Sequence, residues 1–332
     1  MAEGPLVSTV ILHWGDARVT QECVRSVLDS SHQNLDVVVV DNCPSSRAWN
    51  SPSEVARGVV YLQAQTNTGY CAGNNLGIRR AMQSEPAYIL LLNNDTIVDR
   101  DLIRLCVEFL EIRSDVAVVT PKIYFYHRPD FINLAGGALD INTGEIVFFG
   151  GNQRDSAQFD TAREVTFATG CALFARSRAL VQVGFFDEDL FCYGEDVDLS
   201  RRLLLAGMHV FYLPQARVWH RCASMSVDEN LGLHTLPSPS TTYYLWRNRL
   251  YNLRRFAAAQ RTRRYSRYAA AFLRKFASFA LRHRRPRLCL AMILGARDAI
   301  AGRMGKRDYS VFDAPTTKGD LTDPRVSSGV GS

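Results

Sequence analysis

The chain has 332 residues, of which 47% are hydrophobic, enough for one large domain with a sizeable core and an additional segment. Its eight cysteines are scattered without a CxxC pair and the chain start is not signal-like, which argues against a disulfide framework or a zinc site and predicts reduced thiols in a cytoplasmic protein. The net charge of +6 is unevenly distributed, because 18 Lys and Arg residues but only two acids lie between Arg247 and Asp308. The remainder carries 21 basic and 31 acidic residues, which suggests two regions with different partners.

The first part of the chain alternates short apolar runs with segments of helical periodicity. Short apolar runs are typical of buried parallel strands, and apolar residues at helical spacing between them indicate crossover helices. This alternation predicts an α/β fold with a doubly wound, mostly parallel sheet. The strands are expected at 7–12, 35–40, 59–62, 88–92 and 116–119, and the helices at 19–30, 74–83 and 101–113.

The pattern changes after the fifth strand. Residues 124–160 are rich in Gly, Asn and aromatic residues, which predicts a loop or a small antiparallel excursion. A strand at 167–174, a helix at 196–206 and a strand at 209–213 are expected to follow.

The end of the chain has a different composition. A first domain is predicted over 1–240, and a basic, amphipathic helical region over 241–307. The last residues, 308–332, are rich in Thr, Ser, Gly and Asp and are predicted to be disordered. The longest apolar run of the basic region, LCLAMILGA, is too short to span a bilayer, so a soluble or peripheral protein is expected.

Polar residues end several of the predicted strands, at the edge where open α/β sheets bind ligands. The first strand ends in HWGD and the second in Asp41 and Asn42, which could hydrogen-bond a base or a ribose. A simple Asp-Asn-Cys-Pro turn explains Asp41 and Asn42 equally well. The phosphate-binding pattern GxGxxG is absent after the first strand, which argues against a dinucleotide-binding enzyme.

The strand at 88–92 leads into Asn93-Asn94-Asp95. A nucleoside diphosphate needs its charge neutralised, and a divalent cation held by Asp95 would do this, with Asn93 as a neutral oxygen donor. The alternative is an ordinary Asn/Asp turn. The stretch NTGYCAGNNLG at 67–77 indicates tight backbone conformations beside a ligand, or else a plain loop and helix cap.

The segment 185–220 carries the acids and the histidine of most interest. Glu195 and Asp196 open an amphipathic helix, whose N-terminus should keep Asp196 deprotonated near neutral pH and able to accept a proton. Helix capping is the alternative role for these acids. His220 follows a strand and could be a metal ligand or a phosphate donor, or simply structural.

Six motifs in order resemble family-2 glycosyltransferases of the GT-A fold, especially their rhamnosyltransferase-like branch. They span roughly residues 6–255 and are VVVVDN, NTGYCAGNNLGI, LLNNDTIVD, ATGCALFARS, GFFDEDLFCYGEDVDLSRRLLLAG and YLWRNRL. The resemblance implies that 1–240 is a catalytic domain that transfers a sugar from a nucleotide-sugar donor, dTDP- or UDP-linked, with inversion at the anomeric carbon. It also implies a divalent metal cofactor, Mg²⁺ or Mn²⁺.

The resemblance also assigns roles to individual residues. Asp196 falls on the family's catalytic base, with Glu195 beside it on the acceptor side. Asp95 and His220 correspond to metal-binding positions, and Asn93 to Asp95 occupy the place of the DXD motif. The acceptor site would involve Gly170, Cys171 and Tyr193, and the donor site would involve His13, Trp14, Asp41, Asn67, Gly69, Asn74, Asn93 and Asn94.

Two positions depart from the family pattern. Trp14-Gly15 stands where relatives commonly carry an Asn after the aromatic residue, which affects the predicted donor contacts. Asn93 replaces the first acid of the metal motif, which predicts a metal affinity that is weaker or more dependent on the nucleotide.

Substrates and partners stay open at this level. The resemblance favours dTDP-rhamnose, with UDP-hexoses and furanoses as alternatives, and a glycan, a lipid-linked glycan or a natural product as acceptor. A non-catalytic nucleotide-sugar binding protein would be expected to lack the carboxylates of Asp95 and Asp196, and both are present. The basic region, with aromatic residues among its arginines, predicts peripheral contact with the inner face of a membrane rather than nucleic-acid binding, with a solvated helical face as the third possibility.

Overall fold

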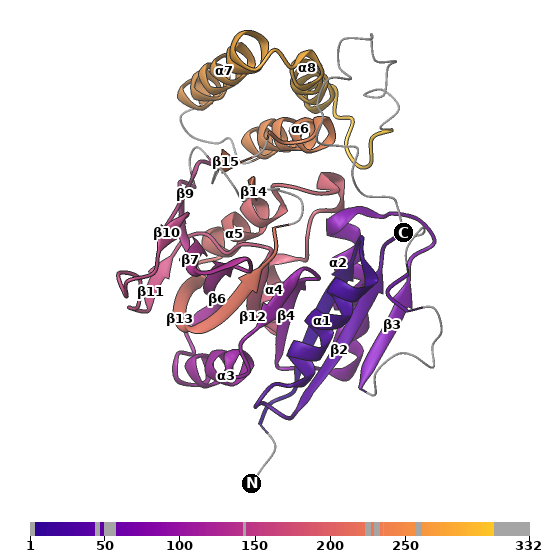
Figure 1. Cartoon of the computed structure of the whole chain (residues 1–332), viewed down its shortest axis with the longest axis vertical. Helices are drawn as coiled ribbons and strands as arrows, with labels where there is room; N and C mark the ends of the chain where they lie inside the picture. Colours follow the sequence, from indigo (N-terminus) through magenta and orange to yellow (C-terminus); the bar gives the residue numbers. More distant parts are fainter. Residues whose placement is uncertain are drawn as a thin grey trace.

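The computed structural model describes residues 4–43, 47–49, 58–141, 144–222, 227–228, 233–234, 236–255 and 261–308. Across these ranges, a twisted sheet with helices on both faces forms the main body, and three C-terminal helices lie against one end of it (Figure 1). The tail predicted to be disordered lies, apart from Asp308, outside the described residues.

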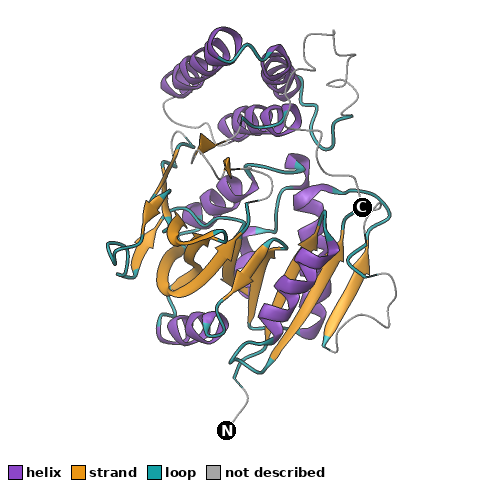
Figure 2. Cartoon of the chain, viewed as in Figure 1, coloured by secondary structure: helices purple, strands orange, loops and turns teal. Residues whose placement is uncertain are grey.

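The central sheet is mixed but mostly parallel (Figure 2), which confirms the predicted fold class. Strands β3, β2, β1 and β4 run parallel in that order, and β12 inserts antiparallel between β4 and β6. Strand β13 continues beside β6 in parallel and also pairs with β5 and β11. The bounds are β1 (Val7–His13), β2 (Leu35–Asp41), β3 (Val59–Gln63), β4 (Tyr88–Asn93), β5 (Thr96–Val98), β6 (Val116–Phe125), β11 (Arg163–Val165), β12 (Ala172–Arg176) and β13 (His209–His220).

Helices cover both faces of this sheet because its strands are apolar on both sides. On β1, Val7 and Ile11 belong to the core shared with α1 and α3, whereas Val10 and Leu12 point to the opposite face, against α2. The first face carries α1 (Ala17–Leu28) and α3 (Leu102–Ile112), and the second carries α2 (Gly69–Ala81), α4 (Ser177–Val183) and α5 (Glu195–Leu205).

Helix α2 begins at Gly69, five residues before its predicted start. Two glycines of the predicted loop, Gly73 and Gly77, are helical residues that allow close packing. A Cβ atom added at Gly73 would lie 2.5 Å from Leu12 Cδ1, and one added at Gly77 would lie 2.4 Å from Val10 Cγ1. These glycines let α2 lie close against β1, so the prediction that they shape a ligand-binding loop is wrong. Of the three glycines in the stretch 67–77, only Gly69, at φ +85°, has a backbone conformation that favours glycine.

The excursion predicted over 124–160 is present as short antiparallel strands. The strand predicted at 167–174 is displaced, however, because Gly170 interrupts it and β12 begins only at Ala172. Phe167 instead forms an isolated bridge with Gly137. The remaining strands are β7 (Arg128–Leu134), β8 (Gly137–Leu139), β9 (Ile146–Phe148), β10 (Gln153–Arg154), β14 (Val227–Asp228) and β15 (Leu233–His234), and the short helical turns are η2 (Met82–Ser84) and η3 (Glu188–Leu190).

The basic region forms α6 (Pro239–Arg255), α7 (Arg261–Ala277), a π-helical turn η4 (Ser278–Arg282) and α8 (Pro286–Ile300). Several of its aromatic side chains do not face outward as a membrane-surface helix requires. Tyr268 and Phe279 are buried, and Phe272 and Phe276 are half-buried against other aromatic and apolar residues of these helices, since the helices pack on one another. Leu281, another apolar residue of this region that could contact a membrane surface, is exposed.

No helix within the described ranges is both long and apolar enough to cross a membrane.

Candidate active site

The carboxyl ends of β1, β2 and β4 bring the predicted donor-site residues to one edge of the sheet. His13 pairs in register with Asp41, and Asn93 lies beside Leu12. Between β1 and β4 the strand order reverses, which is where open α/β sheets form a ligand crevice. The Asn94 amide spans this crevice, because it donates to the Trp14 carbonyl at 3.0 Å.

Asp41 organises the loop that follows β2. Its carboxylate accepts the backbone N–H groups of Cys43 at 3.0 Å and Ala48 at 3.1 Å, and the hydroxyl of Tyr61 donates to it. The side chain is almost fully buried by these contacts. Asp41 therefore fixes the wall of the crevice where the resemblance expects a nucleotide base.

Four further residues that are predicted to bind the nucleotide-sugar donor lie in different environments. His13 is buried, with Nδ1 2.6 Å from Thr20 Oγ1, whereas Trp14 is 52% exposed at the crevice. Asn67 accepts the N–H of Gly69 at 2.9 Å. Asn74 lies inside α2, 1% exposed, with its amide on the Tyr70 carbonyl. Its donor contact stays a prediction, as do those of the equally buried His13 and Asp41.

Strand β13 carries His220 back to the turn between β4 and β5. His220 pairs in register with Thr96, and its Nε2 lies 3.1 Å from Asp95 Oδ1. The other ring nitrogen lies 3.2 Å from Cys222 Sγ. The register of β13 on β5 thus joins two predicted metal-binding residues that are far apart in sequence.

The chemistry of this pair fits a divalent cation. Asp95 and His220 supply a carboxylate oxygen and an imidazole nitrogen that already converge, and Mg²⁺ commonly uses few protein ligands together with substrate phosphates. In the described part of the chain, no group of three or more His, Cys, Asp or Glu side chains could hold a metal ion. Burial opposes protonation of His220, but the neighbouring Cys171 and Asp95 raise its pKa well above its usual value, so a proton competes for the nitrogen that a cation would use.

The N-terminus of α5 presents Glu195 and Asp196 next to each other. Burial raises the pKa of Asp196 to about 6, opposed by N–H donors from Val197 and Gly170. Burial and the neighbouring Asp196 charge raise the pKa of Glu195 to about 8. Desolvation therefore opposes the helix N-terminus, which favours the ionised form, but a pKa of about 6 is still compatible with the predicted deprotonation of Asp196 near neutral pH. Asp196 has the lower pKa of the two, so it ionises more readily than Glu195, which fits the proton-accepting role predicted for it.

The predicted acceptor residues link the two halves of the site. The Gly170 amide is bonded to Asp196, and the next carbonyl, that of Cys171, accepts the N–H of Asn93 at 2.9 Å. The Cys171 sulfur is also in contact with His220. Residues 170 and 171 therefore connect the proton acceptor on α5 with the predicted metal pair.

Helix α6 holds the loop that leads into α5, a role that the sequence did not reveal. The Asn248 amide donates to the carbonyls of Leu190 at 2.9 Å, Cys192 at 2.9 Å and Tyr193 at 2.6 Å. Tyr193 adopts φ +67°, an uncommon conformation for a residue other than glycine. The fully buried side chain of Asn248 thus fixes a strained turn immediately before the catalytic candidates.

Arg247 supports the same loop. Its guanidinium donates to the Leu190 carbonyl at 2.8 Å and to the Asp189 carbonyl at 3.2 Å, and it is 1% exposed. Arg247 had been counted with the surface charge of the basic region, but a buried cation that donates to backbone carbonyls has a structural function. The sequence signal for this role was the motif YLWRNRL, which contains Arg247 and Asn248.

A family model described as glycosyltransferase like family 2 matches residues 5–231. The chain belongs to glycosyltransferase family 2. It is therefore an enzyme of the nucleotide-sugar transferase class, as the six motifs implied.

Two curated relatives act in polysaccharide or lipid-linked glycan synthesis by their names. Poly-beta-1,6-N-acetyl-D-glucosamine synthase of Staphylococcus aureus (strain COL) is 22% identical over 276 residues, which cover 80% of this chain and 60% of the synthase. N-acetylglucosaminyl-diphospho-decaprenol L-rhamnosyltransferase of Mycobacterium tuberculosis is 41% identical over 81 residues, 24% of this chain and 26% of that enzyme. The chain thus spans well under two thirds of either relative.

Solved structures share the fold at low identity. GalNAc-T7, crystallised with UDP, GalNAc and Mn²⁺, has a TM-score of 0.54 at 15% identity, covering 65% of this chain and 43% of its own. TarS 1-349 of S. aureus has a TM-score of 0.52 at 14% identity, covering 90% of this chain and 82% of its own. Both likenesses support the GT-A fold.

Proposed function

We propose that the chain is an inverting, divalent-metal-dependent glycosyltransferase that moves rhamnose from dTDP-rhamnose to a hydroxyl of a lipid-linked glycan. The observation that carries this proposal is Asp196, an ionisable carboxylate tied through Gly170 and Cys171 to the Asp95–His220 pair. The short match to a rhamnosyltransferase with a lipid diphosphate in its name supports the donor and the acceptor class.

The chemistry is a direct displacement. Asp196 accepts the proton of the acceptor hydroxyl while that oxygen forms a bond to the anomeric carbon of the donor. The bond between the anomeric carbon and the diphosphate breaks, and the nucleoside diphosphate leaves with its electron pair. General-base assistance of this kind contributes about 10²–10⁴-fold.

The remaining site residues hold and orient the donor. Asp41 and its loop would receive the nucleotide base, with Trp14 exposed beside it. Asp95 and His220 would hold a divalent cation that neutralises the charge of the diphosphate. Protonated Glu195, beside Asp196, can donate a hydrogen bond toward the acceptor.

We also propose that the basic helices dock the enzyme on an anionic membrane face, where a lipid-linked acceptor resides. Leu281 is 79% exposed and is followed by the exposed Arg282, Arg284 and Arg285. Each such cation near an anionic surface contributes about 1 kcal/mol. Flotation with phosphatidylglycerol vesicles should fall at high salt and on reversing the three arginines to Glu. Equal flotation of the wild type and the reversed protein would disprove docking through this segment.

The enzymatic proposal is tested with the purified full chain and a panel of nucleotide sugars. Release of nucleoside diphosphate from dTDP-rhamnose with Mg²⁺ or Mn²⁺, and its loss in excess EDTA, is the expected result. Faster release from a UDP-hexose or a furanose donor would redirect the donor assignment. Binding of a donor without any turnover would instead favour a nucleotide-sugar binding protein.

A further inference from the structure

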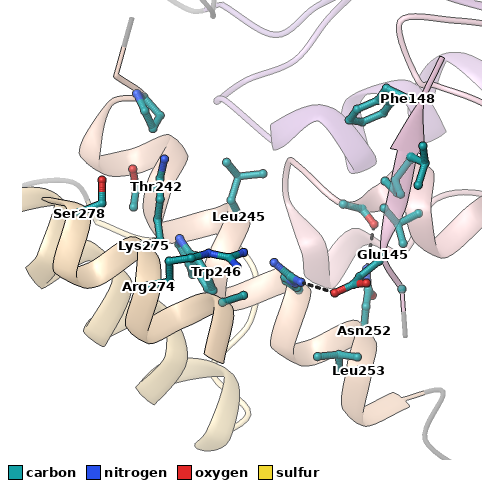
Figure 3. Close-up of a pocket in the computed structure, with 18 of the residues that line it drawn as sticks. Glu145, Phe148, Thr242, Leu245, Trp246, Asn252, Leu253, Arg274, Lys275 and Ser278 are labelled. Carbon is teal, nitrogen blue, oxygen red and sulfur yellow. Dashed lines mark hydrogen bonds and ion pairs between the residues drawn. The ribbon is translucent and has the colours of Figure 1, made fainter. Parts of the chain in front are cut away.

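A large cavity lies beside the catalytic candidates, between the β9 hairpin, the start of α5, and helices α6 and α7 (Figure 3). Its volume is about 810 Å³, within the range of small-molecule sites. Gly194, the residue immediately before Glu195, forms part of its wall. The cavity therefore adjoins the end of α5 that carries the proposed base, and the transfer chemistry does not otherwise use it.

Much of the wall is apolar. Phe148 from β9 lies across the cavity from Leu245 and Trp246 of α6 (Figure 3), and Val147 and Leu253 also line it. Three of these side chains are also open to solvent, because Val147 is 60%, Phe148 58% and Leu245 43% exposed. Exposed apolar side chains around a cavity indicate a ligand with an apolar part that covers them.

Three cations line the same cavity. Arg249 lies 3.6 Å from Glu145, an acid that also pairs with Arg267. Burial, together with the nearby Arg274, lowers the pKa of Arg249. Among the described residues, no carboxylate forms a salt bridge with Arg274 or Lys275, both of which are exposed, and Lys275 rests over the Phe279 ring. The positive charge at this wall therefore exceeds the negative charge, as an anionic ligand would require.

Two buried polar side chains in the wall keep an unused oxygen. Within the part of the chain that the structure describes, Thr242 Oγ1 and Asn252 Oδ1 have no hydrogen-bond partner, and both atoms are closed to solvent. The amide of Asn252 donates to the Gly194 carbonyl at 2.9 Å, so this side chain joins the cavity wall to the turn that precedes Glu195.

We propose that this cavity binds the acceptor as an amphipathic diphosphate supplied by the membrane. The apolar wall of β9 and α6 takes the first part of a lipid chain, and Arg274 and Lys275 take the phosphates. This inference rests on the proposed function, since it assigns the site of that reaction's acceptor. Neither cations nor apolar residues alone explain the cavity, whereas a lipid diphosphate matches both.

The test is binding of farnesyl diphosphate to the full chain without vesicles, measured by calorimetry. Farnesol and inorganic pyrophosphate are each expected to bind at least tenfold more weakly, because each meets only half of the site. The double variant Arg274→Glu, Lys275→Glu should lose at least tenfold in affinity. The matched control Arg282→Glu, Arg284→Glu makes the same charge change on exposed residues outside the cavity and should lose less than twofold.

Equal losses in the two double variants, or no binding of farnesyl diphosphate to the wild type, would overturn the inference. All four substituted residues are exposed, and unchanged unfolding temperatures would show that both double variants fold. Donor hydrolysis without acceptor separates this inference from the proposed function. If hydrolysis occurs but farnesyl diphosphate does not bind, only the acceptor site is wrong. If farnesyl diphosphate binds as expected and no nucleotide sugar is turned over, the proposed function is wrong and the cavity remains a lipid-diphosphate site.

Discussion

Asn248→Ala tests whether α6 positions the catalytic turn. The Asn248 amide has two hydrogens shared among three carbonyls, those of Leu190, Cys192 and Tyr193. Leaving a buried carbonyl unpaired costs about 1–3 kcal/mol, so losing this amide should cost roughly 2–6 kcal/mol of stability in the turn. Because the turn determines where Asp196 lies, we expect kcat to fall about 10–100-fold, which corresponds to ~1.4–2.7 kcal/mol of the barrier.

The assay compares kcat, the donor KM and the unfolding temperature with those of Leu250→Ala. Leu250 is buried on the same helix but contacts the C-terminal helices rather than the turn, and its truncation should cost about 2–5 kcal/mol. Leu250→Ala should therefore lose stability and keep its kcat. For Asn248→Ala, the donor KM should stay within about threefold, because the donor crevice lies at β1, β2 and β4. The apparent pKa of the base should fall below about 6, because water reaches Asp196. If both variants lose stability and neither loses kcat at a temperature where both are folded, the positioning argument is wrong.

Three other predictions concern the carboxylates and the cation. The kcat/KM for transfer should rise with pH and level off above an apparent pKa of about 6, because only ionised Asp196 accepts a proton, and a flat profile from pH 5 to 8 would contradict this. Because the pKa of Glu195 is raised to about 8, the free energy of unfolding of the wild type should fall as pH rises from about 4.5 through 8. Glu195→Gln should make this fall smaller, as measured by denaturant titrations at pH 6 and pH 9. Asp95→Ala should weaken Mn²⁺-dependent binding of nucleoside diphosphate at least tenfold in calorimetry, whereas Asn93→Ala should cost less; equal losses would move the metal site away from Asp95.

The sequence predicted the sheet well because its strands are apolar on both faces. The run at 88–92 became β4 with every residue buried, and the polar triplet after it lies at the ligand edge, where the parallel arrangement requires it. Asp95 and His220, to which the resemblance assigns metal binding, lie in contact because the end of β13 pairs with the start of β5. Periodicity and strand-end chemistry are local signals, and a sequence displays them directly.

Features that depend on tertiary contact were not predicted. Gly73 and Gly77 suggest a ligand-binding loop by composition, and only the closeness of β1 shows that they serve packing. Burial by surrounding elements raises the pKa of Asp196 to about 6, an effect that its position at a helix N-terminus does not indicate. Arg247 and Asn248 look like surface residues of a basic helix until the turn that they bind is seen.

The most direct test of the central claim is the turnover of dTDP-rhamnose by Asp196→Asn under saturating donor and divalent metal, with donor affinity measured on the same preparation. The account predicts that donor affinity stays within about threefold while turnover falls at least 10²-fold, because the substitution removes only the proton acceptor. Turnover within twofold of the wild type, at unchanged donor affinity, would contradict the assignment of Asp196 as the base and with it the proposed reaction.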